Sequence, residues 1–406
     1  MDGDDRSIAR FTALSHATFH GYELSIPVFV VVWLDAFSVT AATLGLVLAA
    51  GFALVGIGGP PCGVLADRYG SKRLVLCSIG GMGLSFALIA LSPNVLVLTL
   101  ALVVWGAAAS LYHPAGLSLI SRGAEARGTV LGYHGAAGSV GTAVGPSLAL
   151  ALLVVLDWRA VAFVFVLPAL FAVALGLRID LGEGDLGDSD ATTTVATADG
   201  GHVRSFLDSS RTLLTGSFLV VFAIVMSYGI YYRGLTSFLP DVLSRLAIAE
   251  PVAVGGGTVD PAQAVYVGLL LVGVLGQYAG GRLTDRVASI ERALVATFLV
   301  LALASLAFVP AAGMGIVALA AVCAVIGFAM YVFAPMGQAL IAETVPSDLH
   351  GLSYGYTYFG TFGVGALGAS LAGATLTYAT WPALFGLLTA VAVVCAGIAG
   401  WLAVRQ

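Results

Sequence analysis

Two long apolar segments are joined by a short charged stretch, Gly63-Val64-Leu65-Ala66-Asp67-Arg68-Tyr69-Gly70-Ser71-Lys72-Arg73. This stretch holds one acid and three bases in surroundings that otherwise lack charge. A weaker copy occurs much later in the chain, as Gly280-Gly281-Arg282-Leu283-Thr284-Asp285-Arg286. We predict that each stretch is a tight charged loop between two membrane-spanning helices. The pair then divides the protein into two related halves.

The composition indicates a membrane protein that crosses the bilayer many times. Of the 406 residues, 59% are hydrophobic and 10% are charged, whereas a soluble domain carries about 25% charged residues. The apolar residues form runs close to the roughly 20 residues that a helix needs to cross a bilayer. Twelve spans are predicted: Arg10–Leu34, Ala41–Ala66, Lys72–Leu91, Val95–Ser121, Arg127–Leu156, Arg159–Leu177, Thr212–Pro240, Gln263–Leu283, Glu291–Pro310, Gly313–Ala342, Leu352–Tyr378 and Pro382–Val404.

The two halves repeat at nearly constant offsets. The matching pairs are Asp67 and Asp285, 218 residues apart, Pro114 and Pro335, 221 apart, and Gly128 and Gly351, 223 apart. Such offsets favour one six-helix unit used twice in the same orientation. We therefore expect an all-α membrane protein of twelve transmembrane helices in two pseudo-symmetric six-helix bundles, residues 1–177 and 212–406. The acid-rich stretch 178–211 is predicted to be a flexible linker.

The basic residues predict the orientation in the membrane. With these spans, fourteen of the seventeen Lys and Arg residues fall on one side, which the positive-inside rule makes cytoplasmic. Both termini and the linker are therefore predicted to be cytoplasmic, in a multi-pass protein of the plasma membrane. A short loop over residues 241–261 is expected on the other side.

Ionisable side chains within spans are costly in lipid and usually face an internal cavity. The candidates are His16, His20, Glu23, His113, His134 and Arg233. The first three are spaced by four and three residues, so they share one face of the first span. Burial favours the neutral form of a carboxyl group, and histidine titrates near neutral pH, so either type could carry protons. Each histidine could equally be a hydrogen-bonded packing residue.

Arg233 has three possible roles. It could attract an anionic group of a substrate, act as a counter-ion, or extend its charge to the membrane interface. Neutral polar groups of the second half add weaker cavity candidates, namely Tyr228, Gln277 and Gln338. In the fifth span, Gly138, Gly141 and Gly145 precede Pro146. This pattern is typical either of close helix packing or of a flexible point, and both interpretations stay open.

The pattern Gly-x-Leu-x-Asp-Arg-x-Gly-x-Lys-Arg after the second of twelve spans resembles the signature of the major facilitator superfamily. Three further stretches resemble its fosmidomycin-resistance branch, which is similar to drug efflux pumps. They are Ser15-His16, Leu111-Tyr112-His113-Pro114 and the glycine-rich run from Gly135 to Pro146. The resemblance implies that spans one, four, seven and ten line a central cavity, and most of the ionisable candidates lie on these spans.

The resemblance also implies a cytoplasmic gate motif at the charged loops. In the first copy it comprises Gly63, Asp67, Arg68, Gly70 and Arg73, and Asp67 would meet the start of the eleventh span near His350, with Arg122 as a partner. The second copy, Gly281, Asp285 and Arg286, is degenerate, because Ala288 stands where a glycine is expected. There, Arg282 or Arg286 could pair with Glu343.

We therefore expect a secondary active transporter that works by alternating access, with proton-coupled efflux of a drug-like or anionic small molecule. An importer or uniporter of a small nutrient is the alternative, and a non-transporting membrane receptor is a lesser one. The four cysteines lack metal-ligand spacing, so no metal and no cofactor are predicted. Motifs for ATP binding, hydrolysis or nucleic-acid binding are missing from the sequence, so an enzyme is not expected. The expected partners are the substrate, protons and the lipid bilayer, and we expect a monomer.

Overall fold

The computed structural model describes residues 1, 3–179, 210–214, 216–246, 248–254, 257–345 and 349–405. At some positions within helices, including Asp67 and His350, it describes the backbone alone. The predicted linker therefore lies largely outside the described residues.

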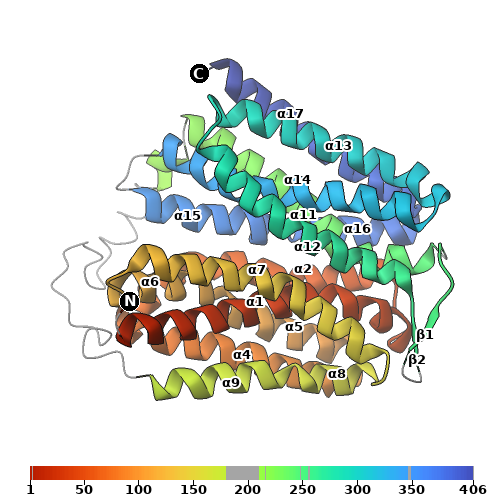
Figure 1. The fold of residues 1–406 in the computed structure, drawn as a ribbon, viewed down its shortest axis with the longest axis horizontal. Coiled ribbons are helices and arrows are strands. Elements are labelled where there is room, and N and C mark those ends of the chain that lie inside the picture. The colour runs from red at the N-terminus through yellow and green to blue at the C-terminus, as the bar shows by residue number, and fades with distance from the viewer. Residues whose placement is uncertain are drawn as a thin grey trace.

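The first half is helical throughout its described length (Figure 1). Its helices are α1 (Gly3–Ala36), α2 (Ala41–Ile57), α3 (Gly59–Tyr69), α4 (Ser71–Ala90), α5 (Val95–Ser110), α6 (Tyr112–Gly123), α7 (Arg127–Leu153), α8 (Trp158–Val164) and α9 (Val166–Arg178).

The second half differs in where its spans are broken, because α12, α14 and α17 are continuous and its fifth span is interrupted by a π-helical turn, and it also contains a short hairpin. Its elements are α11 (Gly216–Arg245), β1 (Val252–Val254), β2 (Gly257–Val259), α12 (Pro261–Thr284), α13 (Ile290–Met314), α14 (Ile316–Thr344), α15 (His350–Tyr358), the π-helical turn η3 (Phe359–Val364), α16 (Leu367–Tyr378) and α17 (Trp381–Arg405).

The predicted fold class is confirmed. Among the described residues, eleven helical stretches are long and apolar enough to cross a membrane, and α2 adds a shorter apolar helix of 17 residues. In Figure 1 the helices α1 to α9 form one layer and α11 to α17 the other. The boundary between the halves at residues 178–211 stays a prediction.

Three predicted spans are each divided into two helices, which the sequence analysis did not foresee. The helices α2, α5 and α8 end at Ile57, Ser110 and Val164, four residues before a proline in each case. Proline lacks the N–H that would bond to the carbonyl four residues back, and its ring clashes with that carbonyl. The chain resumes as a helix after a single intervening residue each time, so the span continues with a break.

The predicted loop 241–261 is partly wrong. Helix α11 continues through Pro240 to Arg245, whose Nε lies 2.9 Å from Oδ1 of Asp241. Further on, β1 and β2 pair in an antiparallel hairpin, with Val252 opposite Val259. The few β-branched residues in segments this short are a weak strand signal, and the glycines between them had indicated a loop.

The two helices nearest the centre of the molecule are α1 and α11. Within an apolar stretch of 18 residues in each helix, 78% of the residues are buried in α1 and 67% in α11, against 33–56% in the other long spans. A helix that is apolar nearly all round and buried belongs to the interior of the bundle. Side chains on these two helices are therefore placed where the halves meet.

The halves approach each other closely where α2 passes α16. The backbone N–H of Ala42 donates to Oγ1 of Thr377 over 2.8 Å. A Cβ added to Gly45 would lie 2.6 Å from the carbonyl oxygen of Ala369 and 3.2 Å from Cα of Ser370, so the helices pack backbone to backbone here. We refer to this region as the α2–α16 contact. It joins the first turns of α2 to α16.

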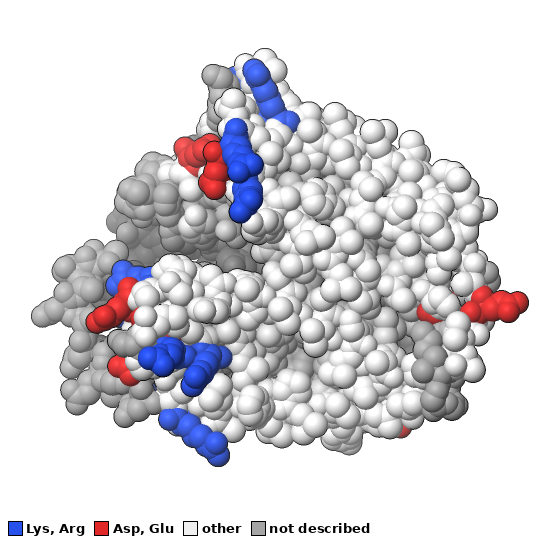
Figure 2. Space-filling model, in the orientation of Figure 1, with Lys and Arg blue, Asp and Glu red and all other residues white. Residues whose placement is uncertain are grey.

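Charged side chains are unevenly distributed over the surface. On the face drawn in Figure 2, the Lys and Arg side chains gather at the left, where Figure 1 shows the N-terminus. At the right end of that face, the described charged side chains are acidic. This distribution is the one expected if the left end faces the cytoplasm, although the orientation itself stays a prediction.

Candidate functional site

A cavity of about 420 Å³ lies between the two halves, lined by both apolar and polar side chains. Eight of the nine residues predicted for the substrate or proton pathway line it, namely His16, His20, Glu23, His113, His134, Tyr228, Gln277 and Gln338. The sequence indicated only which spans carry these residues, so their meeting in one cavity is a finding of the structure. Their roles in transport stay predictions.

The cavity is lined by more spans than the resemblance implied. Spans one, four, seven and ten contribute through α1, α6, α11 and α14. Spans five, eight and eleven contribute as well, through residues such as His134 of α7, Gln277 of α12 and Tyr358 of α15. The hydroxyl of Ser139 donates to Oε1 of Gln277 over 3.2 Å, which links the two halves across the cavity.

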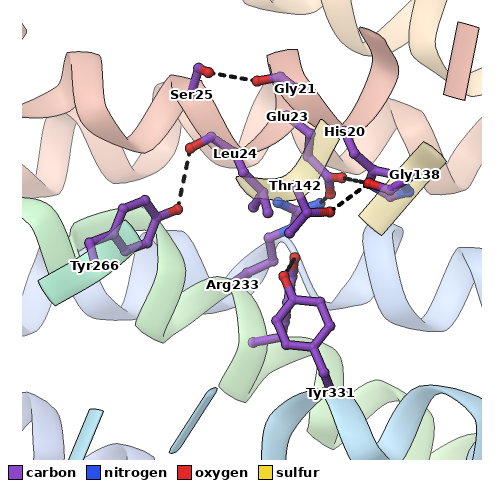
Figure 3. Close-up of polar contacts among 11 residues, drawn as sticks. His20, Gly21, Glu23, Leu24, Ser25, Gly138, Thr142, Arg233, Tyr266 and Tyr331 are labelled. Atoms are coloured by element: carbon purple, nitrogen blue, oxygen red, sulfur yellow. Dashed lines mark hydrogen bonds and ion pairs between the residues drawn. The ribbon is translucent and has the colours of Figure 1, made fainter. Parts of the chain in front are cut away.

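Glu23 of α1 and Arg233 of α11 form an ion pair across the halves (Figure 3). Nη2 of Arg233 donates to Oε1 of Glu23, and each side chain is 1% exposed. The other carboxylate oxygen, Oε2, lies 2.7 Å from Nδ1 of His20, which donates to it in the matching tautomer. Glu23 is thus held from both sides, by a cation of the other half and by a histidine one turn away.

Arg233 lies behind Glu23 and is not among the described residues that line the cavity. Its Cζ is 3.9 Å from the ring centre of Phe52 and 5.1 Å from that of Phe362. Aromatic faces attract a guanidinium group, and the attraction is strongest where water is excluded. Of the three roles considered, this placement matches the counter-ion. The alternative that Arg233 extends to the membrane interface is wrong, because the side chain is buried.

Four histidines form a compact group on the first-half wall of the cavity. The rings of His16 and His134 stack with centres 3.9 Å apart, and Nδ1 of His16 lies 2.8 Å from the backbone carbonyl oxygen of His134. His20 and His113 flank His16 with ring centres at 4.7 and 5.3 Å. Three spans supply these side chains, so the group exists only in the folded bundle.

The glycines of the fifth span lie where α7 packs on α1. A Cβ on Gly138 would be 2.5 Å from Cε1 of His16, and one on Gly141 would be 2.7 Å from Cα of Ala17. Gly145 meets Gly21 in the same way, one turn further along. Helix α7 continues through Pro146. These contacts show that α7 and α1 pack closely at the glycines, and a role as a flexible point stays a prediction.

The first copy of the gate motif is described in part. Gly70 has φ of +86° in the turn from α3 to α4, a backbone conformation that favours glycine. Arg68, Arg73 and Arg122 are exposed at helix ends, and Nζ of Lys72 donates to the carbonyl oxygen of Ile179. The side chain of Asp67 lies outside the described part of the structure, as does that of His350, so the predicted contact between them stays a prediction. The same holds for the surroundings of Gly63.

The second copy is more open. Asp285 ends α12 as an exposed residue, and Gly281 and Arg286 lie beside it at the surface. Cζ of Arg282 is 4.8 Å from the ring centre of Tyr278. Among the ion pairs of the described residues, none joins Glu343 to Arg282 or Arg286. The pairing proposed for them from the sequence is therefore wrong in this conformation.

Two functional neighbours were missed or undervalued by the sequence analysis. Phe52, which faces the guanidinium of Arg233, is one apolar residue in an apolar helix and gives no signal of its own. Tyr358 stacks on His113 with ring centres 5.1 Å apart and so joins the halves at the cavity. It lies in the run Tyr354-Gly355-Tyr356-Thr357-Tyr358, which by itself does not indicate which of its tyrosines faces the cavity.

Membrane-length helices in two layers, with a cavity between them, are the arrangement of a polytopic membrane transporter. Residues 13–332 and 256–406 match the family model described as Major Facilitator Superfamily. The chain therefore belongs to the major facilitator superfamily, as the charged loop had indicated.

Curated relatives match a short segment. The triacylglyceride transporter of Mycolicibacterium smegmatis is 31% identical over 119 residues, which is 29% of this chain and 21% of that protein. A triacylglyceride transporter of Mycolicibacterium hassiacum is 34% identical over 119 residues, or 29% of this chain and 22% of the relative. The chain thus matches only about a fifth of the length of these relatives.

Solved structures match over almost the whole chain. A bacterial homologue of the human lysosomal transporter Spinster, inward-facing and unoccupied, has a TM-score of 0.73 at 14% identity, covering 99% of this chain and 97% of its own. The nucleoside transporter NupG has a TM-score of 0.77 at 13% identity, and the match covers 98% of this chain and 99% of NupG. The human organic anion transporter MFSD10 has a TM-score of 0.67 at 16% identity, and the match covers 98% of this chain and 100% of MFSD10. At such low identity these matches establish the fold alone.

Proposed function

We propose that this transporter exports small amphiphilic or anionic compounds in exchange for protons, by alternating access of the cavity to the two sides of the membrane. The observation that carries the proposal is the buried pair of Glu23 and Arg233 beside the cavity. A proton bound by Glu23 would remove the negative charge that Arg233 balances. The interaction between the halves would then depend on protonation, which is what coupling requires.

The chemistry of the cavity supports this cargo class. Its second-half wall is aromatic, with Tyr228, Tyr232, Tyr331 and Phe333, and its first-half wall carries the histidines. Aromatic rings accommodate apolar groups, while neutral or charged imidazoles interact with polar ends of a ligand. The partial likeness to triacylglyceride transporters is compatible with an amphiphilic cargo, and the fosmidomycin-resistance branch remains the proposed subfamily.

The conformation supports a site reached from the cytoplasm. Residues lining the cavity include Leu117, Ile341 and Tyr354, which lie towards the ends of α6 and α14 and the start of α15. These are the ends that the basic residues assign to the cytoplasm, whereas the α2–α16 contact joins the halves near the start of α2 and the end of α16, which the same prediction assigns to the outer side. We therefore propose an inward-facing state, in the plasma membrane, with both termini cytoplasmic.

The test uses purified full-length protein in liposomes that contain a trapped pH-sensitive dye. Fosmidomycin, the compound that gives the resembled branch its name, is the first probe, followed by a panel of amphiphilic anions. Addition of a transported probe should move protons in the opposite direction, and an uncoupler should abolish uphill accumulation. Glu23→Gln and Arg233→Ala should each abolish gradient-driven transport, while Glu125→Gln, at an exposed acid near the start of α7, should leave it unchanged.

The direction of transport distinguishes import from the proposed export. Inside-out vesicles that accumulate the probe when acidified inside support export, whereas accumulation in right-side-out vesicles under an inward proton gradient supports import. Full transport by both Glu23→Gln and Arg233→Ala would refute the assigned coupling site. A protein that moves no member of the panel would leave the receptor as the better interpretation.

A further inference from the structure

The histidines of the cavity have the arrangement of a metal site. His16, His20 and His113 each offer one ring nitrogen, and these three nitrogens lie within 4.8 Å of one another. A tetrahedral Zn²⁺ ion with Zn–N distances of about 2.0–2.1 Å holds its nitrogens roughly 3.3 Å apart. Side-chain rotations that bring the nitrogens closer by up to about 1.5 Å would therefore complete a three-histidine site.

Two of the three rings are already oriented by hydrogen bonds from their other nitrogen. Nδ1 of His16 faces the carbonyl oxygen of His134 at 2.8 Å, and Nδ1 of His20 faces Oε2 of Glu23 at 2.7 Å. Both acceptors require the ring to be protonated at Nδ1, which leaves the lone pair on Nε2. Metal-binding histidines almost always have such a partner, a backbone carbonyl or a carboxylate, on the nitrogen away from the metal.

The nitrogens left over lack partners. Nε2 of His16 and Nε2 of His113 are buried and, within the described part of the chain, make no hydrogen bond. Buried polar atoms in proteins nearly always have a partner, and exceptions call for an explanation such as an absent ion. Nδ1 of His134, in the same group of rings, also lacks a partner among the described residues, and three such atoms on one wall of a cavity are not explained by packing.

The surroundings also suit a cation that enters from the cavity. His20 is 22% exposed and Glu23 is adjacent, so the site has one accessible ligand and one nearby negative charge. Glu23 is shared with Arg233, which keeps it oriented without using the Oε2 atom that holds His20. Three protein ligands leave the fourth position of a tetrahedral ion open towards the cavity.

We propose that His16, His20 and His113 bind one divalent first-row transition-metal ion, of the Zn²⁺ or Co²⁺ type, with its fourth position facing the cavity. Imidazole ligands suit these ions, whereas Ca²⁺ and Mg²⁺ require oxygen ligands. The site does not depend on the direction of transport or on the identity of the cargo. A binding measurement can therefore fail while the proposed function holds, and the reverse is equally possible.

The experiment titrates Co²⁺ into the purified full-length protein in detergent, after removal of any affinity tag, and follows the visible absorption of the metal. Zn²⁺ is then added as a competitor, and isothermal titration calorimetry gives the stoichiometry. We expect saturation at one ion per chain, an intense spectrum typical of tetrahedral nitrogen ligation, and displacement by Zn²⁺.

The variants are chosen to preserve packing. His16→Phe and His113→Phe keep an aromatic ring, and His20→Gln changes the most exposed member. Each should weaken binding by about 100-fold or more, because loss of an outer-shell partner alone costs roughly 10–100-fold. The matched control is His134→Phe, which keeps the stacked ring and the backbone carbonyl that orients His16, and it should bind as tightly as the original protein.

Gel filtration and thermal unfolding without metal identify any variant that fails to fold, and His20→Gln is the variant least exposed to that risk. Saturable binding that the three ligand variants lose and the control keeps supports the site. Absence of saturable binding, binding that survives in His20→Gln and His113→Phe, or a loss in His134→Phe as large as in the others overturns it.

Discussion

Arg233 of α11 and Glu23 of α1 are 210 residues apart in the chain and form a buried ion pair across the two halves of the protein. Both side chains are 1% exposed, so neither charge can be satisfied by water. The pair has the cavity on one side, through Glu23, and the aromatic rings around Arg233 on the other. The stability of this conformation and the proposed coupling therefore depend on the same contact.

The first prediction separates the contribution of the ion pair to stability from its proposed role in coupling. Removing one member of a buried pair leaves an uncompensated charge and costs about 3–5 kcal/mol, whereas replacing both by apolar residues is often neutral or stabilising. Glu23→Leu and Arg233→Met should each lower the midpoint of thermal unfolding in detergent, and the double variant should recover most of the loss. Transport should be absent from all three.

A double variant as unstable as the sum of the two single variants would show that the residues do not interact. Recovery of transport together with stability would show that the pair is structural and carries no coupling role.

The second prediction concerns the packing of α7 on α1. Gly138→Ala places a methyl group 2.5 Å from Cε1 of His16 and should displace that ring from its stack on His134. Overpacking of this kind typically costs about 1–3 kcal/mol. We expect a lower midpoint of thermal unfolding and, if the metal site exists, weaker Co²⁺ binding.

The matched control is Gly132→Ala on the same helix, where an added Cβ has nothing within 4 Å. Because alanine favours the helix over glycine by up to about 1 kcal/mol, this variant should be as stable as the original or slightly more so. Equal effects of the two substitutions would mean that the His16 contact is unimportant.

The third prediction concerns the α2–α16 contact. Gly45→Leu cannot be accommodated against the backbone at Ala369, so it should separate the two helices and favour a state that is open at that end. Gly397→Leu is the control, since a Cβ on Gly397 has nothing within 4 Å.

The measurement is cysteine labelling with a membrane-impermeant maleimide, in a background without the four native cysteines. Gln338→Cys reports on the cavity, and Thr380→Cys, at the exposed turn before α17, reports on the opposite surface. The Gln338→Cys variant should react in inside-out vesicles and be protected in right-side-out ones, with Thr380→Cys showing the reverse. Gly45→Leu should reduce labelling of Gln338→Cys in inside-out vesicles, and no change would argue against the contact as a closed end.

Much of the fold follows from local sequence. The apolar runs determined where the helices lie, because each backbone must satisfy its own hydrogen bonds in lipid, and the charged loops indicated where they end. The three broken spans were only partly predictable from their prolines, because α2, α5 and α8 each end four residues before one, whereas α7 and α11 continue through Pro146 and Pro240. The hairpin of β1 and β2 was not, because two strands of three residues leave almost no periodic signal.

The sequence by itself determined that the protein has two related sets of membrane helices and which polar side chains those helices carry. Only the tertiary structure decided which of them meet: that Arg233 is the counter-ion of Glu23, that Phe52 and Tyr358 belong to the site, and that three histidines from α1 and α6 converge. Helical periodicity fixes the face of a residue on its own helix. The rotation and axial offset of one helix against another depend on the packing of the whole bundle, and no local pattern records them.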